Sequence, residues 1–121
     1  ASLPFEKLKG IGAKSYQSYK EKYKIEPTAY ALYAGEAARV AIDGIKRAAP
    51  ALDKAMAAKD IKAARDAVRQ AIAGTKNFEG INGKWSFDEN GDTTIETMSG
   101  YKVVKADTPI GCKFEFETIL E

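Results

Sequence analysis

The chain has 121 residues, a formal net charge of +2 and 45% hydrophobic residues, which is enough for one domain or a piece of one. Acidic and basic residues are mixed and no basic block stands out, so we expect no nucleic-acid partner. No apolar run is long enough to cross a bilayer, and the opening residues ASLPFEKLKG lack the apolar segment of a signal peptide. A mature or shortened chain would lack that segment too.

The residue types argue against an enzyme. The chain has no histidine, which is the usual general base, metal ligand and activator of nucleophiles. Cys112 is the single cysteine, so no internal disulfide can form. Without a base to activate it, its thiol is better interpreted as a small packed group than as a nucleophile. We therefore expect no catalysis and no cofactor.

The composition changes near Gly74. Most alanines precede this residue, whereas Trp85, four of the five phenylalanines and most threonines follow it. The pattern predicts a single partial domain over residues 1–121, helical over 1–76 and strand-rich over 77–121. Helices followed by strands fit an α+β unit or the last section of a larger α/β domain.

The first expected helix covers residues 11–23. Tyr16, Tyr19 and Tyr23 recur at steps of three and four, so they lie on one face. Such a stripe could form a stacking platform, but aromatic rings at helical spacing usually pack against a core. We interpret this stripe as half-buried packing.

The second expected helix covers residues 29–49, after Pro27 and with Thr28 as its N-cap. Pro50 is expected to end it. Its apolar stripe consists of Tyr30, Tyr33, Ala34, Ala37, Val40, Ala41, Ile45 and Ala48. Because most of these side chains are small, the helix can lie close to a neighbour, and a sheet is the expected one.

Polar residues occupy the other side of this helix: Glu36, Arg39, Asp43, Lys46 and Arg47. Asp43 and Arg47 can pair at i,i+4. A third helix is expected to begin after Asp60 as its N-cap and to end at Gly74. Its predicted buried face consists of Ile61, Ala64, Val68, Ala71 and Ile72.

Three stretches alternate between apolar and polar residues, as half-buried strands do. They are KWSF at 84–87, YKVVK at 101–105 and KFEFETIL at 113–120. The residues expected on shared faces are Trp85 with Phe87, Tyr101 with Val103, and Phe114 with Phe116.

An acidic turn follows the first of these strands. Asp88, Asn90 and Asp92 have the spacing of the first ligands of a calcium loop. However, the position that requires glycine holds Thr93, the position that requires glutamate holds Ser99, and the flanks read as strands. We therefore expect no metal here.

The same turn contains Asn90-Gly91, a strong hairpin signal because both residues accept positive φ. It predicts strands near 84–87 and 93–97, joined at 89–92, with the carboxylates keeping the tip solvated.

The stretch 78–92 also fits the pattern F-x-G-x-x-G-x-W-x-F-D-x-N-G-D. It resembles the C-terminal part of type I periplasmic substrate-binding proteins, the branched-chain amino acid receptors of ABC transporters. Three further segments are similar in the same order: PFEKLKGIGAKSYQSYKEKYKIEP, AYALYAGEAARVAIDGI and AARDAVRQAIAGTKNFEG. One departure is Gly35 before Glu36, where the family often has an aromatic residue. The chain resembles roughly the last third of such a receptor.

The resemblance implies an α/β fold in which two lobes close around a small molecule, with the helices mainly in the first lobe. It implies an amino-acid or amide-type ligand, a membrane permease as partner, a periplasmic location and no chemical reaction. Tyr30, and then Tyr33, are the expected ligand contacts, since the start of this helix faces the cleft in the family. The alternative is that both rings only pack.

A second functional hypothesis needs no family. The chain could be a free-standing α+β interaction module that associates with itself, its ligand unknown. The alanine-rich face of the helix over 29–49 would be exposed without a sheet, and exposed apolar faces favour association. A homo-oligomer is therefore expected of this chain by itself.

Overall fold

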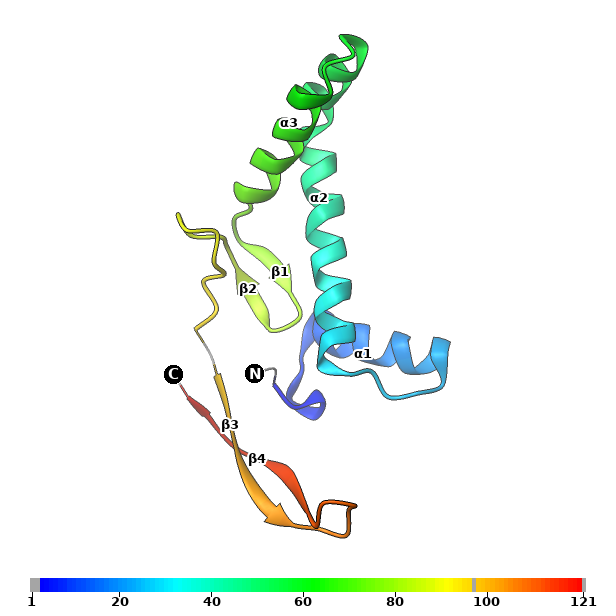
Figure 1. Ribbon diagram of the computed structural model, residues 1–121, viewed down its shortest axis with the longest axis vertical. Helices are drawn as coiled ribbons and strands as arrows, with labels where there is room; N and C mark the ends of the chain where they lie inside the picture. Colours follow the sequence, from blue (N-terminus) through cyan, green and yellow to red (C-terminus); the bar gives the residue numbers. More distant parts are fainter. Residues whose placement is uncertain (1–2, 97, 121) are drawn as a thin grey trace.

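The computed structural model describes residues 3–96 and 98–120 (Figure 1). A short 3-10 turn precedes three helices and four strands, in the order that the composition predicts. The helices are α1 (Gly10–Tyr23), α2 (Ala29–Ala57) and α3 (Ile61–Ala73). The strands are β1 (Phe78–Gly80), β2 (Gly83–Trp85), β3 (Met98–Lys105) and β4 (Cys112–Leu120). They form two separate antiparallel pairs, β1–β2 and β3–β4.

Helix α1 matches its prediction to within a residue. The ring of Tyr16 stacks on Phe5 at 5.0 Å between centroids and packs against a small core of Leu8, Leu32 and Ile81. Tyr19 is also half-buried, whereas Tyr23 is exposed. The packing interpretation of the tyrosine stripe is confirmed for its first two members.

The predicted end of α2 at Pro50 is wrong, because the helix continues to Ala57. Proline removes one helical hydrogen bond, but its φ suits a helix, and packing against α3 holds the later turns in place. The helix stops where Lys59 adopts φ 55°. There the N–H of Lys59 donates to Met56 O and that of Asp60 to Ala55 O, which is a Schellman motif.

Helices α2 and α3 form an antiparallel pair with very close backbones (Figure 1). A Cβ atom added at Gly44 would lie 2.4 Å from Ile72 Cγ1, so only glycine fits there. The small residues of α2 thus permit a close neighbour, as predicted, but that neighbour is a helix rather than a sheet. Several members of the predicted α2 stripe stay exposed for lack of a cover: Tyr30, Tyr33, Ala34, Ala37 and Ile45.

Helix α3 begins and ends as expected. The Asp60 carboxylate accepts a hydrogen bond from Ala63 N at 2.9 Å, and Gly74 is the C-cap. Of the predicted buried face, Ala64 is buried and Ile61 is exposed. Ile61 lies on the first turn of α3 and lines an open groove together with Leu52 and Met56 of α2. No helix in the described ranges has the length and apolar character needed to cross a membrane.

The hairpin at the acidic turn differs from its prediction. Lys84 and Trp85 pair with β1, whereas Phe87 makes a single bridge to Thr93. The turn itself is present, since Asp88 N donates to the carbonyl of Asp92 at 2.9 Å.

Only Gly91 has positive φ in this turn, at 87°, and Asn90 does not. The connection is therefore a longer loop with glycine in the left-handed position, not a two-residue turn. No strand forms over 94–96, and Thr97 lies outside the described residues.

Strands β3 and β4 confirm the two strands predicted over 101–105 and 113–120. Tyr101 pairs with Phe116 and Val103 with Phe114, so the predicted faces are correct. The expected half-burial is wrong for Val103 and Phe114, which are 63% and 76% exposed, whereas Phe116 is half-buried. The hairpin extends away from the helices, so no described helix covers its apolar face (Figure 1).

Candidate functional site

The start of α2 is fixed by local contacts. Pro27 is buried, Thr28 is extended, and the Thr28 hydroxyl accepts a hydrogen bond from Ala31 N at 3.2 Å. Just before them, the carboxylate of Glu26 accepts from the Tyr16 hydroxyl and pairs with Lys20. These bonds hold the pKa of Glu26 below its usual value, with Lys20 as the larger cause. The helix therefore begins at a defined position and orientation relative to α1.

The two predicted ligand residues lie in different surroundings. Tyr30, on the first turn of α2, is 83% exposed, and its side chain makes no hydrogen bond within the described part of the chain. Tyr33 lies one turn later, and its hydroxyl accepts a long hydrogen bond from Asn82 Nδ2 at 3.4 Å. The structure thus brings Tyr33 against the β1–β2 hairpin and leaves Tyr30 projecting from the helix start.

Tyr33 borders a cavity of about 340 Å³ between α2 and the β1–β2 hairpin. Its walls are mostly aromatic and aliphatic: Tyr33, Glu36, Ala37, Val40, Ala41, Ile72, Trp85, Phe87 and Thr93. A small apolar side chain matches these walls in size and chemistry.

Glu36 has a role that the sequence did not reveal. It was assigned to the polar side of α2, yet it faces the β1–β2 hairpin and is half-buried. One carboxylate oxygen accepts from Ile81 N and the other from Trp85 Nε1 at 2.9 Å. A Cβ atom at Gly80 would lie 2.3 Å from Trp85 Nε1 and 2.8 Å from Glu36 Oε1. The sequence contained one signal for this contact: Glu36 lies three residues after Tyr33, and Trp85 follows the glycine pair Gly80 and Gly83.

Arg39 makes a further contact from α2 to this hairpin. Its Nη2 donates to Glu79 O at 3.1 Å, and its guanidinium lies over the Phe78 ring at 5.1 Å from the centroid. It too was assigned to the solvated side from the sequence. Arg39 reaches β1 because of where the hairpin lies. The periodicity of the helix gives no information about that position.

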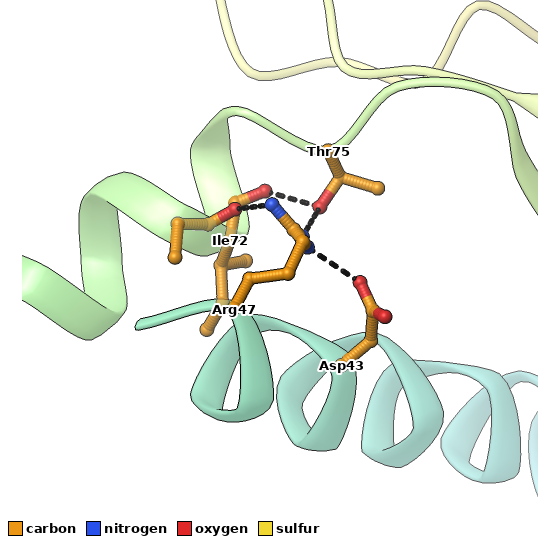
Figure 2. Close-up of polar contacts among 5 residues, drawn as sticks. Asp43, Arg47, Ile72 and Thr75 are labelled. Carbon is orange, nitrogen blue, oxygen red and sulfur yellow. Dashed lines mark hydrogen bonds and ion pairs between the residues drawn. The ribbon is translucent and has the colours of Figure 1, made fainter. Parts of the chain in front are cut away.

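A second polar cluster joins α2 to the end of α3 (Figure 2). Arg47 pairs with Asp43 at 2.7 Å, which confirms the predicted i,i+4 pair. It also donates to Ala71 O and, at 2.7 Å, to the hydroxyl of Thr75, which in turn donates to Ile72 O at 2.6 Å. Arg47 therefore satisfies the carbonyl of Ala71 near the C-terminus of α3, where a positive charge is favourable.

The acidic turn is organised by Asp88. Its carboxylate accepts from the backbone N–H groups of Asn90 at 2.8 Å and Asp92 at 2.9 Å. These bonds, with that of Asp92 the largest cause, hold the pKa of Asp88 below its usual range. The carboxylate thus serves the turn, and within 3–96 and 98–120 no group of three metal-binding side chains gathers.

One apolar groove of about 690 Å³ runs along α2 and α3. Its lining includes Leu52, Met56, Ile61, Val68, Ile72 and Phe87, with Arg65 and Arg69 among the polar residues. Across these sites the chain offers rings, aliphatic side chains and fixed hydrogen-bonding groups. Groups of these kinds can hold a small molecule that has both apolar and polar parts.

No protein-family model matches this chain, and no curated protein sequence does. Among solved structures, it is similar to a leucine-binding protein, LivK, from Thermotoga maritima MSB8. The identity is 25%, the TM-score is 0.66, and the likeness covers 99% of this chain but 29% of that protein. That match supports the resemblance drawn from the sequence motifs. The chain therefore has the α/β architecture of a part of a type I periplasmic binding protein.

Proposed function

We propose that this chain is part of the solute-binding component of an ABC importer for branched-chain amino acids or related small molecules, and that it acts without catalysis. The observation that carries the proposal is the likeness to a leucine-binding protein along 99% of the chain. Because the chain spans 29% of that protein, the complete site would include groups outside this sequence. The proposal includes a membrane permease as partner and a periplasmic location, both of which the same likeness supports.

Tyr30 is the first proposed ligand contact and Tyr33 the second. A tyrosine ring exposed as fully as that of Tyr30 offers a large apolar surface and a polar tip at low entropic cost. Tyr33 adds a ring at the mouth of the cavity beside Trp85. Together they suit a small molecule with an apolar side chain and a polar head group.

Calorimetric titration with L-leucine tests this assignment in a polypeptide that comprises both lobes. Tyr30→Ala is expected to weaken binding about tenfold or more, equivalent to about 1.4 kcal/mol, with the melting temperature nearly unchanged. Tyr23→Ala is the matched control, since Tyr23 is also exposed but lies at the far end of α1. An unchanged affinity for Tyr30→Ala, or loss of the fold, rejects the assignment.

The second candidate is a self-associating interaction module. It is favoured by the exposed apolar face of β3–β4 and by the groove along α2 and α3. We expect the 121-residue chain by itself to sediment as a dimer or larger assembly and to bind neither branched-chain amino acids nor small amides. Micromolar binding by a monodisperse monomer would show a complete site here, and the partial-lobe interpretation would then be dropped.

A further inference from the structure

Three residues of α2, each three positions apart, hold the β1–β2 hairpin. Tyr33 contacts Asn82, Glu36 contacts Ile81 and Trp85, and Arg39 contacts Glu79 and Phe78. Side chains at this spacing lie on one side of a helix. The hairpin is therefore tied to α2 along its length, from its tip at Asn82 to its base at Phe78.

The contact of Glu36, the middle residue of the three, involves the most deeply buried partners. Ile81 and Trp85 are 5% and 4% exposed, so the N–H groups that Glu36 binds have little access to water. A carboxylate in such a place is stable only when both oxygens are hydrogen-bonded, and here each has its own donor. Gly80 completes the arrangement, because any side chain there would collide with the indole and the carboxylate.

We propose that Glu36 is a positioning residue for the ligand site, and this rests on the proposed function above. By fixing Ile81, Glu36 fixes the hairpin tip, and the neighbouring Asn82 then presents its amide to the Tyr33 hydroxyl. The orientation of the Tyr33 ring, and with it the shape of the cavity mouth, depends on a carboxylate that does not itself need to touch the ligand.

The first experiment measures the contact directly in this chain. Trp85 is the single tryptophan, so its indole N–H gives one resonance in a proton–nitrogen NMR spectrum. Glu36→Gln replaces one acceptor by a donor, which leaves either Ile81 N–H or Trp85 Nε1–H facing another donor. We expect deuterium exchange of the proton that loses its acceptor, the Ile81 amide or the Trp85 indole proton, to become about tenfold faster or more. Asp43→Asn, which removes a carboxylate two turns later on α2, should leave it unchanged.

The second experiment separates positioning from support of the fold. In a polypeptide with both lobes, Glu36→Gln should weaken L-leucine binding about threefold to tenfold at a temperature where both proteins are fully folded. Tyr33→Phe keeps the ring but removes the hydroxyl through which Glu36 acts. In that background, Glu36→Gln should therefore have no further effect on affinity, as a double-mutant cycle will show.

Each outcome decides a different point. Unchanged exchange of both the Trp85 indole proton and the Ile81 amide proton in Glu36→Gln would show that the carboxylate does not hold these two groups. Faster exchange with unchanged leucine affinity would leave Glu36 as a support of the fold and overturn its positioning role. Failure of the unaltered two-lobe polypeptide to bind L-leucine, L-isoleucine, L-valine or small amides would reject the proposed function, and the positioning role with it, whatever the exchange experiment gives.

Discussion

The two hairpins of this chain are held in opposite ways. The β1–β2 pair has three residues in each strand, yet Trp85 and Ile81 within it are almost fully buried. The β3–β4 pair has strands of eight and nine residues, yet Phe114 in it is 76% exposed. Strand length therefore does not decide which hairpin is integrated into the fold. Contacts from another element do, as expected for two-stranded hairpins, which are marginally stable alone.

The difference lies in what α2 supplies to each hairpin. For β1–β2 it supplies a carboxylate, a guanidinium and a tyrosine at one helical spacing. In the described part of the chain, Val103 and Phe114 of β3–β4 pair with each other and not with a residue of α2. The apolar face of the longer hairpin consists of Tyr101, Val103, Phe114 and Phe116. Its composition is that of a packed sheet, yet Val103 and Phe114 in it are 63% and 76% exposed.

The largest expected effect comes from comparing two variants, each of which removes one aromatic ring from one of the two hairpins. Trp85→Ala should lower the free energy of unfolding by about 3–5 kcal/mol, because Trp85 contacts Phe78, Phe87 and Glu36 in a buried place. Phe114→Ala should cost less than about 1 kcal/mol, since its ring faces Val103 and solvent. Urea denaturation of both variants tests the comparison, and equal losses would contradict it.

The next effect compares two glycines of α2. Gly44→Ala should destabilise the chain by about 1–3 kcal/mol, because its Cβ would meet Ile72 at 2.4 Å. Gly35→Ala has no heavy atom within 4 Å of its new Cβ and should stabilise the chain by up to about 1 kcal/mol through helix propensity. Thermal unfolding followed by circular dichroism measures both. A gain in stability for Gly44→Ala would mean that α2 and α3 can move apart enough to accept a methyl group at little cost in free energy.

A smaller effect is expected at the link between α2 and α3 (Figure 2). Arg47→Ala removes hydrogen bonds to Ala71 O and Thr75 Oγ1 and should cost about 1 kcal/mol, since Arg47 is partly exposed. Lys62→Ala removes an exposed i,i+4 pair with Asp66 and should cost less than about 0.5 kcal/mol. Chemical denaturation of the pair is the measurement, and a larger loss for Lys62→Ala would overturn the ranking.

The sequence predicted the elements better than their partners. The three helices, the caps at Thr28 and Asp60, and strands β3 and β4 follow from periodicity and capping residues, which are local. The end of α2 was predicted wrongly because the rule that proline ends a helix considers only neighbouring residues. Packing against α3 stabilises the turns of α2 beyond Pro50. The pairing of β2 with β1 was missed because Asn90-Gly91 predicted that the strand before this turn pairs with the residues after it.

The candidate site was predicted only in part. Tyr30 and Tyr33 were chosen from a family resemblance, and their contact with a ligand stays a prediction. Glu36 and Arg39 were placed with the solvated residues because helical periodicity separates polar from apolar faces. It does not say that a hairpin some forty residues later returns to bind two charged side chains. Such polar contacts between distant segments require the tertiary structure.

The smallest expected effect concerns the acidic turn, where β2 continues toward the longer hairpin. Backbone N–H groups, first that of Asp92, hold the pKa of Asp88 below its usual value of about 3.9. A carboxyl whose pKa is lower in the folded state stabilises that state above the unfolded pKa. The stabilisation is lost as the pH falls through the lower, folded pKa. Asp88→Asn should therefore be slightly less stable than the unaltered chain at pH 7, with the difference shrinking as the pH falls below about 4 and through the lower, folded pKa. Urea midpoints across this range, with Glu89→Gln as the neighbouring carboxylate control, measure it. A difference that stays constant or grows in acid would show that the Asp88 carboxylate does not hold the turn through its charge.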